Sequence, residues 1–255
     1  AADLFLIDDP LPTQEELAKI VLRQHQNAEV PAPDAATLKK AVEATSGLAP
    51  FPAEQIVAMS LKKTGIEIEP LWERKRQMIR QTPGLSVWQG SESLTDLKGI
   101  DHAKSFIEKL IAAEAFNAIV FIDEGDKAFA GGMSDHTGDS GVSKDQVGTI
   151  LTYIEDTGSM GILFAGVAGT GKTQLAKAAG AASGKPVIAF DLGGMKAGTV
   201  GNSEAQIRNA LKVVTATANG KVLFIMTANK TTTFSPELNR RFADQFFFSL
   251  PTNDS

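Results

Sequence analysis

The chain has no cysteine among its 255 residues and only three histidines, His25, His102 and His136. Without cysteine there is no disulfide, no thiol nucleophile and no cysteine metal site, which favours a reducing compartment such as the cytoplasm. The histidines lie far apart in the sequence, so no pair has the spacing of metal ligands. These absences exclude a disulfide-stabilised secreted domain and argue against a structural zinc site.

Long apolar runs and an excess of positive charge are also missing. No apolar stretch approaches the roughly 18 residues of a membrane-spanning helix, and the N-terminus lacks the basic-then-apolar pattern of a signal peptide. The net charge is -5 and the isoelectric point is near 5.3. This balance argues against the broad basic field that non-specific nucleic-acid binding uses. We therefore expect a soluble intracellular protein that is not associated with a membrane.

A glycine-rich motif at residues 166–173 is the most specific feature that is present. It reads Gly-Val-Ala-Gly-Thr-Gly-Lys-Thr and matches the G-x-x-x-x-G-K-[ST] phosphate loop. An apolar run precedes it and a helical pattern follows it, which is the context that the motif requires. Its glycines let backbone N–H groups approach an oxyanion, and its lysine and last threonine suit the outer phosphates and Mg²⁺. The predicted nucleotide-binding residues are Gly166, Ala168, Gly169, Thr170, Gly171, Lys172, Thr173 and Gln174.

The sequence pattern divides the chain into two parts joined by a linker. Residues 1–82 are predicted to be mainly helical after a strand-like run at residues 4–7, with helix-capping signals at Thr13 and Asp34. Residues 83–93 are rich in turn formers and are predicted to be the linker. Residues 94–255 alternate short apolar runs with helical patterns, which is typical of a parallel sheet covered by helices. The strands predicted in this part span residues 118–122, 162–165, 187–190, 222–227 and 245–248.

Two acids follow the first of these strands, upstream of the phosphate loop. Hydrolysis of a phosphate anhydride needs a carboxylate that positions the metal and a group that orients water. Asp123 is predicted to hold Mg²⁺ through water, and Glu124 to point at the attacking water. A rival metal carboxylate is Asp191, which ends the strand downstream of the loop, but Leu192 follows it instead of a second acid.

The rival carboxylate also opens an alternative interpretation as a GTPase. Residues 191–194 fit the D-x-x-G pattern, and Asn229 with Lys230 begins an N-K-x-D pattern. Position 232 is threonine, so the aspartate that would pair with the guanine edge is missing. Adenine is therefore the preferred base, and the GTPase stays the less favoured alternative.

Polar residues that suit transition-state chemistry follow the later strands. Asn229 ends the apolar run at residues 222–228, where its amide suits a hydrogen bond to water or to the γ-phosphate. Arg240 and Arg241 precede the last strand. Guanidinium groups there could reach into the site of a neighbouring subunit and stabilise the developing negative charge.

Together these segments resemble the AAA+ ATPase superfamily, with Asp123 and Glu124 as the Walker B acids, Asn229 as sensor 1, and Arg240 and Arg241 as arginine fingers. Within the superfamily the sequence is most similar to the plastid and cyanobacterial open-reading-frame ATPases. The resemblance covers nearly the whole chain. It makes ATP the expected nucleotide and Mg²⁺ the expected metal, held by Thr173 and Asp123.

The resemblance also implies an adenine contact. Residues 96–101, Asp-Leu-Lys-Gly-Ile-Asp, are similar to the family segment that touches the base through its backbone. Leu97 and Gly99 are accordingly the residues expected beside adenine.

The chain departs from the family in the order of its segments. Its acidic pair precedes the phosphate loop, whereas the family places that pair after the second strand and its helix. A site at the C-terminal ends of parallel strands depends on spatial order, so moving one strand–helix unit need not change the sheet. We predict an α/β fold of the P-loop NTPase type, with a parallel five-stranded sheet in the spatial order 5-1-4-3-2, rewired in chain order, and a small N-terminal helical lid-like domain.

Two further departures concern the lid and the pore. The lid-like helices lie in residues 1–82 rather than after the last strand, so they are either a lid permuted to the N-terminus or the remnant of a preceding ATPase domain. Thr199 occupies the pore-loop position where the family usually carries an aromatic residue, which leaves polypeptide threading open.

The resemblance implies an ATP-hydrolysing motor or remodelling factor that acts as a homo-oligomeric ring, a hexamer in the family, on a macromolecular client. Protein, nucleic acid and an enzyme complex all stay open as that client. The alternative from another class is a nucleotide-switched scaffold that assembles on ATP and hydrolyses little of it. A small-molecule P-loop kinase is weakened by Asn229 and the arginine pair.

Overall fold

The computed structural model of the chain describes residues 11–88, 92–130, 144–193, 195, 203–230 and 234–250. It divides into two compact units, Ala1–Gln77 and Met78–Ser255. The predicted strand-like run at residues 4–7 and the pore-loop position Thr199 lie outside the described residues. Among the described helices, none combines the length and the apolar character that crossing a membrane requires.

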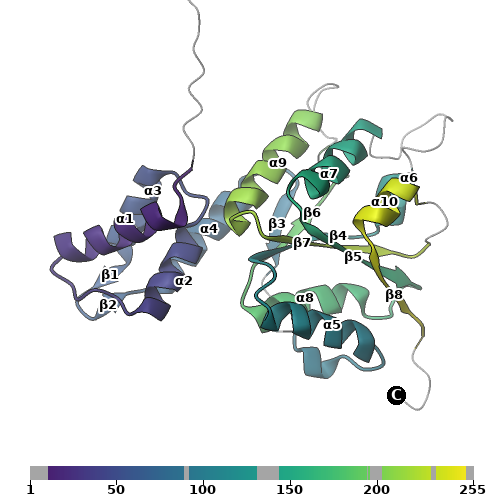
Figure 1. The fold of residues 1–255 in the computed structure, drawn as a ribbon, viewed down its shortest axis with the longest axis horizontal. Helices are drawn as coiled ribbons and strands as arrows, with labels where there is room; N and C mark the ends of the chain where they lie inside the picture. Colours follow the sequence, from purple (N-terminus) through teal and green to yellow (C-terminus); the bar gives the residue numbers. More distant parts are fainter. Residues whose placement is uncertain are drawn as a thin grey trace, which may run out of the picture. The chain divides into compact units, whose positions relative to one another are not determined.

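The first unit is built from short helices around a small core (Figure 1). Its elements are α1 (Gln14–Asn27), α2 (Ala35–Thr45), α3 (Pro50–Ser60), β1 (Leu61–Lys62), β2 (Gly65–Ile66) and the first part of α4 (Ile68–Arg80). The capping predictions are confirmed, because the side chains of Thr13 and Asp34 accept backbone hydrogen bonds at the starts of α1 and α2. The short β1–β2 hairpin was not predicted.

The second unit contains a six-stranded sheet. Its strands are β3 (Leu85–Trp88), β4 (Ala118–Ile122), β5 (Met160–Gly166), β6 (Val187–Phe190), β7 (Val222–Ala228) and β8 (Asp244–Phe248). Their order across the sheet is β3-β6-β4-β7-β5-β8. All neighbours are parallel except β3, which pairs with β6 in antiparallel fashion.

The edge strand β3 corrects two predictions. The sheet has six strands rather than five and is not wholly parallel, and four residues of the predicted linker 83–93 form part of it. The physical reason is that Leu85 is buried in the sheet core and Val87 packs against the same cluster. A strand of four residues between turn formers buries enough apolar surface to pair, but it is too short to give a clear periodic pattern.

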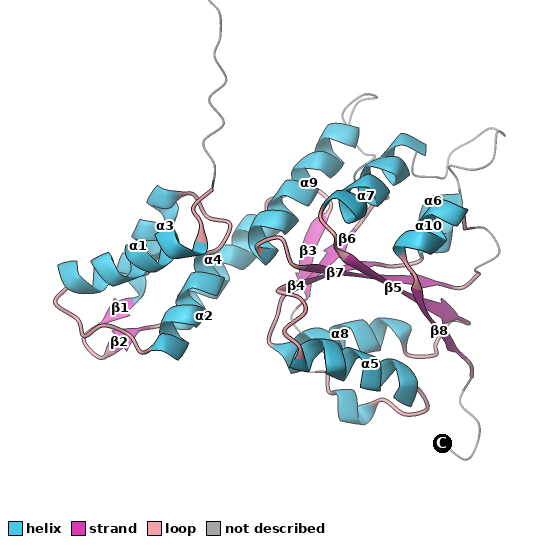
Figure 2. Cartoon of the chain, in the orientation of Figure 1, coloured by secondary structure: helices cyan, strands magenta, loops and turns pink. Residues whose placement is uncertain are grey.

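Helices cover both faces of this sheet (Figures 1 and 2). On one face lie α7 (Lys144–Asp156), α9 (Ser203–Ala218) and α10 (Pro236–Arg241), and on the other lie the 3-10 turn η1 (Leu94–Asp96), α5 (Asp101–Ala112) and α8 (Lys172–Ser183). The central strands β4 and β7 are buried along their whole length. Successive residues of β4 point to opposite faces, so Val120 joins one core and Phe121 the other.

The strand order brings segments that are far apart in the sequence to the same end of the parallel strands. Strand β7 lies between β4 and β5 and is parallel to both. The register pairs Ile122 with Met226 and Ala165 with Ala228. The carboxyl ends of the three strands therefore meet, and each carries one of the predicted chemical segments.

Candidate functional site

The phosphate loop connects β5 to α8. Gly166, Gly169 and Gly171 all have positive φ angles, of 147°, 83° and 87°. Gly171 caps the N-terminus of α8 in the left-handed region, where a residue with a side chain is strained. Thr170 Oγ1 donates a hydrogen bond of 2.9 Å to the carbonyl of Val167 and fixes the turn. Such a loop before a helix can direct several N–H groups at one anion.

Lys172 connects this loop to the neighbouring strand. Its side chain is buried, and Nζ donates to the carbonyls of Gly166 at 2.6 Å and Val167 at 2.7 Å. Nζ also lies 3.3 Å from Oδ1 of Asn229, the residue that follows β7. Burial lowers the pKa of the Lys172 ammonium, and the nearby carboxylates of Asp123 and Asp126 act in the opposite direction. The structure thus brings the lysine, the predicted sensor and acids of the β4 turn together.

The first predicted acid is oriented by a hydroxyl that the sequence analysis missed. Asp123 Oδ1 accepts a hydrogen bond of 2.6 Å from Thr227 Oγ1, and the same hydroxyl accepts from the backbone N–H of Glu124 at 2.9 Å. Thr227 is 2% exposed and lies in β7. A hydroxyl residue near the end of an otherwise apolar strand was the available signal. The bridge fixes the Asp123 carboxylate beside the end of β7.

The second predicted acid, Glu124, has a positive φ of 48° at the turn after β4. Its side chain is 48% exposed. Both of its oxygens accept hydrogen bonds from Nζ of Lys127, at 2.7 and 2.8 Å. Lys127 belongs to the short helix α6 (Gly125–Ala130), and the pKa of its ammonium is raised by this pairing with Glu124. Sequence analysis did not identify Lys127, although its i+3 spacing from an acid was visible.

The rival carboxylate, Asp191, lies elsewhere on the sheet. It follows β6, and both β4 and β7 stand between β6 and the phosphate-loop strand β5. Its backbone N–H donates to the carbonyl of Gly84 at 2.8 Å. Within the described residues, the carboxylates that act on Lys172 are Asp123 and Asp126. The remaining parts of the GTPase patterns, Gly194 and position 232, lie outside the described residues.

The two arginines have different surroundings. The Arg240 side chain is 68% exposed, with Nη2 3.7 Å from Glu237 of the same helix, α10. The Arg241 side chain is 24% exposed and forms an ion pair with Glu155 of α7. The partners of both groups lie on α10 and α7 rather than on the phosphate loop. Arg241 is therefore anchored within its own chain, whereas Arg240 projects outward.

The residues expected beside adenine precede α5. Gly99 has a φ of 73°, and the carbonyl of Leu97 accepts a hydrogen bond of 2.9 Å from Nζ of Lys104. Leu97 packs against a hydrophobic cluster that includes Leu175 of α8, the helix that follows the phosphate loop. This segment therefore shares its packing with the phosphate-loop helix.

The two metal-ligand candidates fit Mg²⁺ held largely by a nucleotide. Thr173 and Gln174 lie in the first turn of α8, where Thr173 is half-buried and Gln174 exposed. Within the described residues, no three or more His, Cys, Asp or Glu side chains form a group that could hold a metal. Mg²⁺ in phosphate-transfer sites usually takes one or two protein ligands together with substrate phosphates and water, so a group of three such side chains is not required for it.

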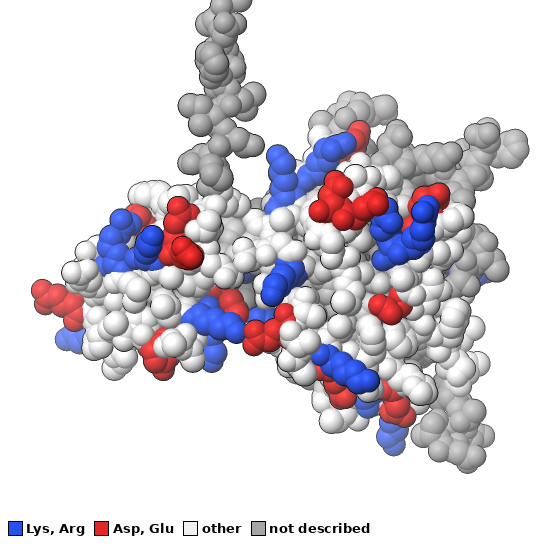
Figure 3. All heavy atoms as spheres, in the orientation of Figure 1, with Lys and Arg blue, Asp and Glu red and all other residues white. Residues whose placement is uncertain are grey.

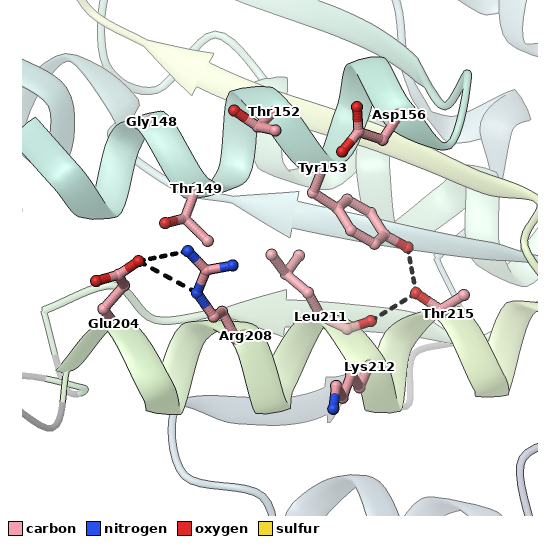
Figure 4. A pocket seen from close by; sticks show the side chains of 10 residues that line it. All are labelled: Gly148, Thr149, Thr152, Tyr153, Asp156, Glu204, Arg208, Leu211, Lys212 and Thr215. Carbon is pink, nitrogen blue, oxygen red and sulfur yellow. Dashed lines mark hydrogen bonds and ion pairs between the residues drawn. The ribbon is translucent and has the colours of Figure 1, made fainter. Parts of the chain in front are cut away.

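A separate cavity of about 660 Å³ lies between α7 and α9 (Figure 4). Tyr153 and Thr215 share a hydrogen bond of 2.6 Å across it, and Arg208 pairs with Glu204 at 2.6 Å. Burial raises the pKa of Tyr153. None of the predicted site residues lines this cavity.

Charged side chains of both signs are interspersed on the face shown in Figure 3. This face carries no broad field of one sign.

Comparisons with known proteins agree with the geometry of the phosphate-loop site. The model of the ATPase family associated with various cellular activities (AAA) matches residues 162–225, which include the phosphate loop but not Asp123 or Glu124. An uncharacterized AAA domain-containing protein, ycf46, from Guillardia theta is 24% identical over 207 residues. The alignment covers 80% of the chain and 34% of that protein, so the chain spans about a third of the length of the curated relative that it matches.

Proposed function

We propose, from the premise that this chain belongs to the AAA+ ATPase superfamily, that it binds ATP with Mg²⁺ and hydrolyses the nucleotide as a subunit of a homo-oligomeric ring. One observation carries the proposal. Lys172 of the phosphate loop contacts Asn229 after β7 and senses the charge of Asp123 after β4, although these residues come from three separate parts of the sequence. In this proposal the cation, the amide and the carboxylate surround one phosphate group of the bound nucleotide.

The roles follow from the chemistry of each group. Lys172 and the loop N–H groups hold the phosphates, and Thr173 with Asp123 holds Mg²⁺, which neutralises charge on the phosphate oxygens when it is bound. Glu124 orients the attacking water and accepts its proton, while Asn229 donates to the γ-phosphate or to that water. Leu97 and Gly99 are proposed to contact adenine through their backbone.

The arrangement of the strands supports a rewired family sheet. Each strand takes the number of the family strand whose segment it carries. Strand β8 is then the fifth family strand, β5 the first, β7 the fourth, β4 the third and β6 the second. The order β8-β5-β7-β4-β6 then reads 5-1-4-3-2, with β3 added at the edge. In this interpretation the acidic strand keeps its place beside β7 although it is encoded before the phosphate loop.

We propose Arg240 as the residue that acts across the subunit interface. Its exposed guanidinium is bound only weakly within α10, whereas the Arg241 guanidinium is paired with Glu155. Arg241 then anchors α10 on α7 and presents Arg240 to the neighbouring subunit. The hexameric ring, the lid-like role of the helical unit and the macromolecular client are part of the same proposal.

One observation favours the second candidate function, a scaffold that assembles on ATP and hydrolyses little of it. Glu124 is tied to Lys127 through both of its oxygens. An ion pair that persists with ATP bound would keep the carboxylate from the attacking water.

The two functions are separated by turnover and mass measured together. We expect the wild-type chain to hydrolyse ATP and to assemble into a ring on ATP. Glu124→Gln should assemble but not turn over, because the amide cannot accept the proton. Lys172→Ala should neither bind ATP nor assemble. Assembly without turnover in the wild type would instead establish the scaffold.

A further inference from the structure

We infer that Asp126 is a positioning residue for hydrolysis, which anchors the sensor segment with one carboxylate oxygen and holds a water molecule in the site with the other. This inference rests on the proposed ATPase function. Asp126 itself has no role in that proposal, where the acids are Asp123 and Glu124.

The backbone places Asp126 beside the end of β7. Gly125 precedes it, and a Cβ atom at Gly125 would lie 2.3 Å from Sδ of Met226 and 3.3 Å from the carbonyl oxygen of Thr227. Only glycine lets the turn after β4 pack this closely against the neighbouring strand. As a result the Asp126 side chain is only 9% exposed.

One carboxylate oxygen is hydrogen-bonded to the sensor segment, residues 229–230, which carries the predicted sensor amide. Asp126 Oδ2 accepts a hydrogen bond of 3.3 Å from the backbone N–H of Lys230. Lys230 follows Asn229, whose side-chain oxygen in turn contacts Nζ of Lys172. Asp126 therefore fixes the peptide that carries the sensor amide and, through it, the position of that amide beside the phosphate loop.

The other oxygen has no hydrogen-bond donor in the part of the chain that the structure describes. Among the described residues, Asp126 Oδ1 is buried without any hydrogen-bond partner. The charge of Asp126 acts on the Lys172 ammonium, but that ammonium is already directed at two loop carbonyls and Asn229. Buried carboxylate oxygens are almost always satisfied by protein groups or by ordered water. We assign a water molecule to Oδ1 of this carboxylate, whose charge acts on Lys172 as that of Asp123 does.

The assignment requires an acceptor at this position. An aspartate can accept from Lys230 and from water at the same time, because each oxygen serves one donor. In Asp126→Asn the single amide oxygen can still serve Lys230, but the amide nitrogen then faces the water as a donor. The backbone anchor survives in this variant, and the water loses its acceptor.

The test compares Asp126→Asn with the wild type and with Asp156→Asn, the same chemical change at an exposed position on α7. We expect kcat for ATP to fall by about ten- to hundredfold in Asp126→Asn, as misplacement of a reacting group does. We expect KM, the ATP dissociation constant and the melting temperature to stay close to wild-type values. Asp156→Asn should match the wild type throughout.

A second readout does not depend on turnover. ADP with aluminium fluoride and Mg²⁺ mimics the phosphate under attack by water, so its affinity should weaken in Asp126→Asn by the same factor as kcat, while that of ADP alone is unchanged. If Asp126→Asn fails to fold, Asp126→Ala removes the acceptor without burying an amide and should show the same split between kcat and KM.

The possible outcomes distinguish a failure of this inference from a failure of the proposed ATPase function on which it rests. A wild-type chain without ATP turnover, or a Glu124→Gln variant that retains it, would overturn the proposed function and this inference with it. If the wild type is active and Glu124→Gln inactive, an Asp126→Asn variant with more than half of the wild-type kcat would overturn this inference alone. An equal loss of ATP affinity and kcat would reduce Asp126 to a structural role and overturn it as well.

Discussion

Lys127 donates hydrogen bonds to both carboxylate oxygens of Glu124, at 2.7 and 2.8 Å. The residue proposed to orient water is thus engaged by a cation three positions along the same turn. Each Glu124 oxygen keeps a second lone pair, but the ion pair holds the carboxylate toward Lys127, and turning it toward a water in line with the phosphate weakens that pair. We therefore expect the pair to restrain the proposed hydrolysis.

Lys127→Ala should raise kcat for ATP by about two- to fivefold, the range that an exposed ion pair accounts for. KM should not change, because Lys127 lies on α6 and the phosphates are held by the loop. Steady-state kinetics of the wild type, Lys127→Ala and Lys127→Arg test this. The arginine variant keeps the pair and should retain the wild-type kcat; an unchanged or lower kcat in the alanine variant would contradict the restraint.

Thr227→Val should impair both stability and catalysis. The buried hydroxyl bridges Asp123 and the Glu124 N–H. Its loss leaves these two groups the 3.2 Å hydrogen bond from the Glu124 N–H to Asp123 Oδ1, at a cost of about 1–3 kcal/mol in the free energy of unfolding for the lost bonds. We also expect roughly a tenfold lower kcat, because the metal carboxylate loses its orientation.

The matched control for that variant is Thr217→Val in α9. Thr217 is also 2% exposed, but its hydroxyl has no partner among the described residues. Removing a buried hydroxyl that forms no hydrogen bond should leave the unfolding free energy almost unchanged. Urea unfolding and ATP turnover should be measured for both variants. Equal losses of stability and kcat in Thr227→Val and Thr217→Val would contradict the role of the bridge.

Arg240→Ala and Arg241→Ala should fail in different ways. Arg240→Ala should lower ATP turnover without loss of thermal stability, since its side chain is exposed. Arg241→Ala should lower stability, since it removes the anchor to Glu155. In rings that mix Arg240→Ala with Glu124→Gln subunits, turnover should partly recover, because some sites then combine an intact Glu124 with an intact finger; no recovery at any mixing ratio would argue against action between subunits.

The affinity for ATP should begin to fall at a lower pH than it would with a lysine of unshifted pKa. Burial lowers the pKa of Lys172 below 10.5, and only the ammonium form binds phosphate. The folded chain loses this proton at a lower pH than the unfolded chain, so stability should rise while affinity falls between the lowered pKa and 10.5. ATP titrations across this range test the prediction. Lys172→Arg should abolish the alkaline loss, and an affinity that stays flat up to pH 10.5 would contradict it.

The sequence predicted the parts of the site that are encoded locally. The phosphate loop and the acid pair each follow an apolar run within a few residues, so their spacing alone predicts the strand and the turn, and their chemistry stays a prediction. Asn229 was predicted for the same reason. These segments meet because parallel strands place their carboxyl ends at one edge.

The contacts missed by sequence analysis depend on register between distant strands or on packing between helices. Thr227 reaches Asp123 only because β7 lies beside β4 with Ile122 opposite Met226. Arg241 meets Glu155 because α10 packs on α7. The edge strand β3 was missed because four residues between turn formers give no periodic signal. Pairing of this kind is decided by tertiary structure.

The central claim is that acids encoded before the phosphate loop serve the same nucleotide as the loop. Mg²⁺-dependent ATP turnover of Asp123→Asn and Asp191→Asn tests it most directly. The account predicts that Asp123→Asn abolishes turnover and that Asp191→Asn leaves it at the wild-type level. Turnover lost in Asp191→Asn and retained in Asp123→Asn would contradict it.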